Sequence, residues 1–461
     1  MNVLILFFFF YTEAFKSRLD SLLLEERYAE ALKIVEDSFK SSPNKLEFEK
    51  LRVYVLAYQG DVFRASNAYL RLYEVTGRHY PELLHWIAIG VFNTDNEKLA
   101  RFLAYRLPLI HDIEAEMPLC RFIERLDNSK RPFFIRNLNK IADSNVFDMA
   151  IRFAREAVTY DEVFTISPLL SRLSICTGIN VVDSLISSNS PYTRAIALWV
   201  AGDMRRPPSG LFEKYMKDRD PMVAMLATIG KLKHVPDPDV AILESYVTNP
   251  EACIRKMLAF HLGFFGTKGE KLLFKLLNDE DDAVKREAAK SLYYMGSGRA
   301  LTPYVQAISY IDPRKKIWGI DNLALIADSS ATFYVVKALN ESPYPAVKVH
   351  AIWALATMGG SAARSVLASL LNSSNSLVKK EAALALGFMG DTRSIIQITR
   401  LARSQDPVTR KRALWILTRL GDRRGYKYLL KGLSDESLDV RVISALGLWR
   451  ILNNPDRVKK E

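Results

Sequence analysis

A repeat of about 31 residues in the C-terminal half constrains the fold of this chain more than any other feature. Each copy has an apolar residue, then usually a basic one, then an Ala/Leu-rich helical segment, and successive copies are 30, 31, 30, 33, 30, 31, 31 and 31 residues apart. The first residues of the copies are Thr193, Val223, Ile254, Val284, Ile317, Val347, Val378, Thr409 and Val440. Such a period is typical of helix pairs that bury their apolar faces against neighbouring pairs. The sequence therefore predicts an all-α fold, an α-α superhelix.

Acidic residues before these segments predict where the helices begin. An aspartate side chain can accept a free backbone N–H at a helix start, and proline suits the first helical turn. Asp-Pro occurs at 220–221, 312–313 and 406–407. We expect caps at Asp220, Asp279, Asp312, Asp406 and Asp435.

The repeat over residues 190–461 resembles HEAT repeats, especially the short subclass found in phycobilisome-lyase-like proteins. The resemblance implies that the second helix of each pair lines the concave surface. It also implies that the basic residue after the apolar anchor pairs with a loop Asp of an adjacent repeat. The residues at that position are Arg194, Arg255, Lys285, Lys348, Lys379, Arg410 and Arg441. Residues 111–189 are expected to be divergent helical repeats or a connector.

A second repeat, with an offset of 34 residues, occupies the N-terminal part. The two copies share the steps four, three and five, in Ala31, Val35, Ser38 and Pro43 and in Ala65, Tyr69, Leu72 and Gly77. A third copy would centre near Leu99 and Ala100. Residues 12–110 resemble tetratricopeptide repeats, although Phe15 and Leu19 replace the Trp and Gly of that family.

Charge and composition bear on partners and location. The net charge is +12, yet residues 1–110 carry 14 Lys/Arg and 14 Asp/Glu, whereas residues 376–461 carry 18 and 9. An acidic partner is therefore expected at the C-terminal part. Three scattered cysteines favour a reducing compartment, and we expect a cytoplasmic protein. The apolar run at residues 3–11 is shorter than the roughly 20 residues of a membrane span, so membrane attachment is not favoured.

The helical period places lysines, arginines and aromatic side chains together on the second-helix face opposite the core. That face is expected to bind a partner through Trp199, Lys256, Phe260, Arg286, Lys290, Tyr293, Trp353, Lys380, Lys411, Trp415 and Trp449. One interpretation is that these rows only fill the inner curve of the solenoid. Another is a groove for an acidic or phosphorylated peptide, and a third is single-stranded nucleic acid stacked on tryptophan.

A separate basic cluster lies near the C-terminus. It is interrupted by Asp406 and Asp422, so it is either a solvated helix face or a phosphate-binding patch. Its members are Arg403, Arg410, Lys411, Arg412, Arg419, Arg423, Arg424 and Lys427.

Catalytic patterns are scarce. None of the six histidines lies in HExxH or precedes Glu, so the iron-binding His-Glu pairs of the HEAT-like deoxyhypusine hydroxylases are missing. His261 and His350 are expected to have satisfied structural roles. Asp321 lies on a core stripe and is expected to be buried and hydrogen-bonded, although DNA glycosylases of HEAT-like fold use such an acid. We predict a non-enzymatic protein-binding scaffold without metal or cofactor; the alternatives are nucleic-acid binding and, more remotely, a glycosylase-like or lyase-like enzyme.

Overall fold

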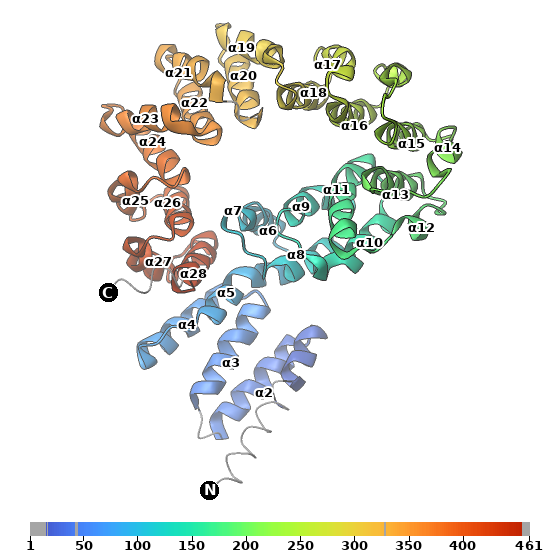
Figure 1. Cartoon of the computed structure of the whole chain (residues 1–461). Helices are drawn as coiled ribbons and strands as arrows, with labels where there is room; N and C mark the ends of the chain where they lie inside the picture. Colours follow the sequence, from blue (N-terminus) through green and yellow to red (C-terminus); the bar gives the residue numbers. More distant parts are fainter. Residues whose placement is uncertain (1–14, 16, 42–44, 327–328, 454–461) are drawn as a thin grey trace. The chain divides into compact units, whose positions relative to one another are not determined.

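The computed structural model describes residue 15 and residues 17–41, 45–326 and 329–453 (Figure 1). Helices and turns account for these residues, and none of them forms a strand. The chain divides into two compact units, residues 1–106 with 386–461 and residues 107–385. The all-α fold predicted from the sequence is confirmed, while the predicted domain boundaries at 110 and 189 stay a prediction. The apolar run 3–11 lies outside the described residues.

The first unit contains helices from both ends of the chain. Residues 17–24 are helical. The N-terminal helices are α2 (Tyr28–Ser41), α3 (Lys45–Tyr58), α4 (Val62–Thr76), α5 (Pro81–Ile89), η1 (Gly90–Asn93) and α6 (Glu97–Ala104). The C-terminal helices are η8 (Thr392–Ser394), α25 (Ile395–Leu401), α26 (Pro407–Leu420), η9 (Arg423–Gly425), α27 (Tyr426–Gly432) and α28 (Leu438–Leu452).

The second unit contains the intervening helices, and α24 (Ser376–Phe388) crosses its C-terminal limit. Its first part comprises α7 (Leu107–Ile110), α8 (Glu116–Glu124), α9 (Arg131–Leu138), η2 (Ser144–Val146), α10 (Phe147–Glu156), α11 (Tyr160–Thr177) and α12 (Val182–Leu185). The middle comprises α13 (Pro191–Asp203), α14 (Leu211–Tyr215), α15 (Pro221–Lys233), η3 (Val240–Tyr246), α16 (Ala252–Leu262), η4 (Gly263–Lys268), α17 (Glu270–Leu276) and α18 (Asp282–Tyr294). The last part comprises η5 (Gly298–Leu301), α19 (Thr302–Ser309), α20 (Pro313–Ile326), η6 (Ser329–Ala331), α21 (Thr332–Glu341), α22 (Pro345–Met358), α23 (Gly360–Ser369) and η7 (Leu370–Asn372).

The repeat period of the sequence corresponds to one helix pair. Every predicted anchor lies in a second helix, namely α13, α15, α16, α18, α20, α22, α24, α26 and α28. The anchors are buried, except for Ile317, which is half-buried. Small residues on the same faces allow close helix approach: a Cβ at Gly202 would lie 3.4 Å from the Cα of Gly230. The predicted second helices are therefore confirmed.

Only some of the expected acids cap these helices. Asp220 accepts N–H bonds from Met222 and Val223, as predicted, and Asp406 caps α26 in the same way. The side chain of Asp312 likewise accepts the N–H of Arg314. The prediction is wrong for two of the five. Asp281 and Ser437 occupy the N-cap positions of α18 and α28, and Asp279 and Asp435 lie two residues earlier with another role.

That other role is a buried ion pair between successive repeats. The Arg255 guanidinium donates to both carboxylate oxygens of Asp279, at 2.7 and 2.9 Å, and each side chain is only 6% exposed. Arg255 also donates to the loop carbonyls of Asn249 and Pro250. The same geometry recurs at Arg194 with Asp218 and at Arg410 with Asp435. The pairing implied for the position after the anchor is confirmed at these three arginines.

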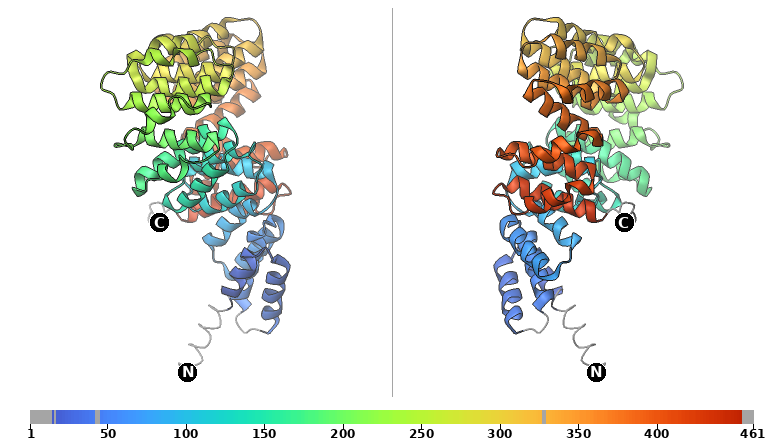
Figure 2. Two further views of the ribbon diagram at one scale, coloured as in Figure 1. Left: turned by 90° about the vertical axis from the view of Figure 1, so that its right-hand side faces the viewer. Right: turned by 90° about the vertical axis from the view of Figure 1, so that its left-hand side faces the viewer.

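The N-terminal helices pack against the C-terminal ones within the first unit. Ala31, Val35, Ala65 and Tyr69 are buried, as the 34-residue repeat predicts. Helix α28 lies beside α5 and also contacts α4 (Figures 1 and 2). The last arginine of the repeat series, Arg441, donates to the Phe63 carbonyl at 3.2 Å and to Asn67 Oδ1 at 2.8 Å, both on α4. Helix α4 therefore supplies acceptors to Arg441 in place of the loop aspartate that Arg194, Arg255 and Arg410 contact.

We expect Arg255→Leu to lower the free energy of unfolding by about 3 kcal/mol, because Asp279 is then buried without its partner. Urea denaturation followed by circular dichroism measures this. The double variant Arg255→Leu/Asp279→Leu should recover most of the loss, since no buried charge remains. Lys285→Leu, at the same repeat position but with its ion pair to the exposed Asp282 of its own helix, is the control and should cost less than about 1 kcal/mol. Equal losses at Arg255 and Lys285 would contradict the buried ion pair.

Candidate functional site

The second-helix face of α13 and α16 forms a packed aromatic cluster. Trp199 is 4% exposed, and its indole N–H donates to Asp203 at 3.1 Å. Its ring centroid lies 5.3 Å from Phe260 and 6.0 Å from Phe164, which belongs to α11. The predicted exposure of Trp199 is therefore wrong, because α11 covers it.

Lys256 is also engaged inside the second unit. Its ammonium lies 4.2 Å from the Phe164 ring centroid and 3.6 Å from the Asp161 carboxylate. A cation on an aromatic face beside a carboxylate is already compensated. Lys256 thus links α16 to α11, and its charge is already balanced by a carboxylate and is weakly available to a ligand.

His261 lies at the base of the same cluster, 1% exposed. Its ring packs against Trp199 and Phe264, and neither ring nitrogen has a hydrogen-bond partner among the described residues. The expectation of a satisfied histidine is wrong in that respect. Burial holds the pKa of His261 well below its usual value, and the nearby charge of Lys233 lowers it further.

Farther along the second unit, the cations of the predicted face on α18 have fewer acidic partners. Arg286 of α18 donates to the neutral Oδ1 of Asn322 at 2.9 Å. Lys290 is half-buried, and no carboxylate in the described part of the chain pairs with it. Tyr293 is half-buried beside the exposed Tyr294, with ring centroids 5.8 Å apart.

Polar links join the next second helices. The Trp353 indole N–H donates to Glu381 at 2.8 Å, and the ring remains half-buried. The Lys380 ammonium lies 3.8 Å from the same carboxyl group, in a looser contact. The Asp321 carboxylate accepts a hydrogen bond from His350 Nδ1 at 2.8 Å, and the Asp321 side chain is 47% exposed. The expected hydrogen bond of Asp321 is present, but its expected burial is wrong.

In the first unit, the predicted residues contact the N-terminal helices. Trp415 is 6% exposed, with the Arg106 guanidinium 5.3 Å from its ring centroid. Lys411 forms a 2.5 Å ion pair with Asp439 and lies over the Phe102 ring.

Trp449 of α28 has a similar internal partner. It stacks on the buried His85 of α5 with 4.3 Å between ring centroids. The predicted exposure of Trp415 is therefore wrong, and Trp449 is half-buried. Their partners, Arg106 after α6 and His85 of α5, lie outside the 31-residue repeat.

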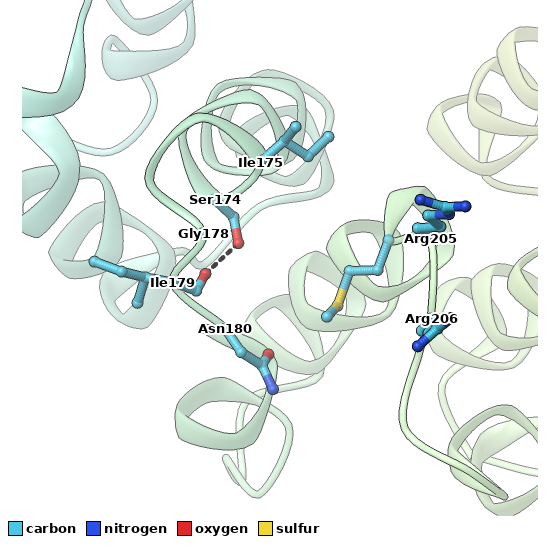
Figure 3. A pocket seen from close by; sticks show the side chains of 8 residues that line it. Ser174, Ile175, Gly178, Ile179, Asn180, Arg205 and Arg206 are labelled. Carbon is cyan, nitrogen blue, oxygen red and sulfur yellow. Dashed lines mark hydrogen bonds between the residues drawn. The ribbon is translucent and has the colours of Figure 1, made fainter.

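The hollow in Figure 3 lies between the end of α11 and the loop after α13. Its volume is 470 Å³, and its walls include Ile175, Ile179 and the exposed Arg205 and Arg206. The hydroxyl of Ser174 donates to the Ile179 carbonyl and so is not held by a base. The hollow offers apolar contact and positive charge rather than a nucleophile with its activating partner.

Other classes of site can be stated for the described residues only. Within them, no group of three His, Cys, Asp or Glu side chains could hold a metal ion. Over the same ranges, no helix has both the length and the apolar content that a bilayer crossing needs.

The side chains that cover the predicted face could not be identified from the helical period. Phe164, Phe102 and His85 belong to helices outside the 31-residue repeat, and helical periodicity places them on apolar faces without indicating which repeat they meet. The acid pairs Asp218-x-Asp220 and Asp279-x-Asp281 did carry a signal. In each pair, the first aspartate binds the arginine of the preceding repeat, and the second, two residues later, caps the helix that follows.

We expect the midpoint temperature of thermal unfolding to decrease when the pH is lowered from about 7.5 to about 5.5, because of His261. Its pKa in the folded state lies below the unfolded value of about 6.5, so the unfolded state binds the proton first and stability falls as pH drops through that value. His261→Phe should flatten this dependence and raise the midpoint at pH 5.5. His234→Gln, at an exposed histidine, is the control and should leave the slope unchanged. A wild-type slope in His261→Phe would contradict the assignment.

Comparisons with known proteins agree with this architecture. Residues 334–404 match the family model for HEAT repeats. Among solved structures, YibA of E. coli is 14% identical, with 57% of this chain and 97% of that chain covered and a TM-score of 0.30. The karyopherin Kap121p, bound to the extreme C-terminus of the protein phosphatase Cdc14p, is 13% identical at a TM-score of 0.35, with 85% of this chain covered. The match spans only 52% of the karyopherin chain.

An engineered protein is 17% identical, with 81% of this chain and 99% of that chain covered, at a TM-score of 0.21. No curated protein matches. The tetratricopeptide-like and phycobilisome-lyase-like resemblances have no counterpart in these matches and stay predictions. The family match over residues 334–404, together with the second helices and the arginine–aspartate links between successive loops, shows that the chain contains HEAT repeats.

Proposed function

We propose that this protein is a non-enzymatic scaffold that binds an acidic protein segment on the second-helix face of α18, α22 and α24. The residues that contact the partner are Arg286, Lys290, Tyr293, Trp353 and Lys380. A cytoplasmic location, proposed from the cysteine content, accords with a scaffold of this kind.

The observation that supports the proposal is that the cations of this face lack close acidic partners and its aromatic rings are only partly buried. Arg286 faces an amide and Lys290 has no carboxylate partner in the described part of the chain, while Tyr293 and Trp353 keep exposed edges. Aromatic and arginine side chains are enriched at the centres of protein interfaces. By contrast, Trp199, Lys256, Lys411 and Trp415 already have internal partners, so we place them in the packing of the fold.

Nucleic-acid binding on the C-terminal second helices is the weaker alternative. Stacking of bases needs an accessible aromatic face, and phosphate tracking needs uncompensated cations. In the first unit the Trp415 ring is buried and Asp439 neutralises Lys411. These two observations favour a protein partner in the second unit.

The test is a titration of the full chain with a labelled Glu-rich peptide and with single-stranded RNA, by anisotropy at two salt concentrations. We expect the peptide to bind and to change the tryptophan fluorescence through Trp353. Arg286→Glu/Lys290→Glu should weaken peptide binding at least tenfold, because two attractive charges become repulsive.

Lys217→Glu reverses an exposed lysine elsewhere in the second unit and is the control. It should leave peptide affinity within about twofold. RNA binding that is steeply salt-dependent, without peptide binding, would support the alternative. An equal loss in Lys217→Glu and in the double variant would contradict a site on α18.

A further inference from the structure

A positively charged hollow in the first unit lies between the loop after α25 and helix α27. Its volume is 610 Å³, within the range of about 300–1,000 Å³ that ligand pockets occupy. Arg403 comes from the loop, and Lys427 and Lys431 come from α27. Arg410 and Leu414 of α26 complete the wall. The hollow shares no residue with the face of α18, α22 and α24, so it does not depend on the function proposed above.

Three cations of this hollow are left without acidic partners. No carboxylate in the described ranges forms an ion pair with Arg403, Lys427 or Lys431, although all three side chains are exposed. The one acid in the wall, Asp435, is already held by two bonds from Arg410 at 2.8 and 2.9 Å. Lysines four apart on a helix repel each other, so the hollow has a local excess of positive charge.

Tyr428 shows how closely two of these charges approach. The Arg403 guanidinium lies 5.1 Å from the Tyr428 ring centroid and donates to its hydroxyl at 3.1 Å, and the Lys427 ammonium lies 5.2 Å from the same centroid. The pKa of Tyr428 is below its ordinary value: desolvation raises it, but the hydrogen bond with Thr399 and the charges of Arg403 and Lys427 lower it by more. The tyrosine thus reports a positive potential at the hollow.

A second hollow of 430 Å³ adjoins the first and shares Lys427 and Tyr428 with it. Ile395 and Ile396 line it, and Ile396 is 70% exposed. A cationic hollow therefore has an exposed apolar side chain beside it. A ligand that fits both carries an anion and, a short distance away, an apolar group.

We propose that Arg403, Lys427 and Lys431 bind the phosphate of a phosphoserine- or phosphothreonine-containing peptide, whose neighbouring apolar side chain rests on Ile396. A phosphate monoester carries a charge of about −1.5 to −2 at pH 7 and three strong acceptor oxygens, which suits three donors around one space. Arginine supplies a planar fork of donors to such an anion, and the lysines add point charges.

The arrangement favours a phosphopeptide over single-stranded nucleic acid. Base stacking would need the Tyr428 ring as a platform, and the two cations already lie against that ring. The neighbouring Arg424 is paired with Asp422 at 2.7 Å, whereas Arg403, Lys427 and Lys431 line one hollow. An exposed isoleucine adds affinity for a peptide side chain but not for a phosphodiester backbone.

The experiment measures binding of the full chain to a labelled pool of seven-residue peptides by anisotropy at 150 mM salt. Each peptide has a central phosphoserine, an apolar residue at one neighbouring position and mixed residues elsewhere. The matched pool has serine, and a 15-nucleotide single-stranded RNA is the third probe. We expect the phosphorylated pool to bind at least tenfold more tightly than the serine pool, and Arg403→Glu/Lys427→Glu to abolish that difference.

Arg400→Glu reverses an exposed arginine on α25 outside the hollow and should keep the preference for phosphoserine. Ile396→Ser should weaken binding of the phosphorylated pool severalfold and leave the protein folded, because the side chain is exposed. Equal affinity for both pools, or an equal loss in Arg400→Glu, would overturn the proposal. Tighter binding of the RNA, lost in Arg403→Glu/Lys427→Glu, would overturn it in favour of a nucleic-acid site.

Discussion

An ion pair between an arginine on one second helix and an aspartate in the next loop links successive repeats at three places in the chain. The Arg255 fork satisfies two loop carbonyls of its own repeat and the Asp279 carboxylate of the next. These hydrogen bonds hold the loop before α16 against the guanidinium. Asp279 in turn accepts the N–H of Asp281, which caps α18. One side chain thus fixes the turn before its own helix and the turn before the following helix.

The same requirement explains how the C-terminal end of the series is completed. Arg441 occupies the position after the anchor Val440, where other repeats have the arginine that pairs with a loop aspartate. Its guanidinium donates to the Phe63 carbonyl and to the Asn67 side-chain oxygen, both on α4. Trp449, on the same helix, stacks on His85 of α5. A terminal repeat of a solenoid needs a partner to cover its apolar face. In this unit α4 and α5, from the N-terminal part of the chain, lie against it.

The helices and their buried anchors could be predicted from the sequence, but the segments that cover the opposite faces of these helices could not. Burial of anchors such as Val284 and Val347 follows from a 31-residue period, since each repeat meets only its neighbours in a defined register. Trp199 is buried because Phe164 packs on it, and Phe164 lies outside the recognisable repeats. The period therefore showed which face a tryptophan occupies, but not whether another segment covers that face. Lys290 stays open on an equivalent face where no such segment supplies a carboxylate among the described residues.

Pairing also determines where the positive charge of the C-terminal part can act. Among the residues after 376, aspartates compensate neighbouring cations one by one, as Asp439 does for Lys411 and Asp391 for Arg393. A compensated cation that is half-buried contributes to packing and has little field left for a distant ligand. The excess of basic residues is therefore a poor guide to a binding surface by itself. The informative cations are those that the fold keeps close together without an acid, and around Tyr428 their mutual repulsion is relieved when an anion binds between them.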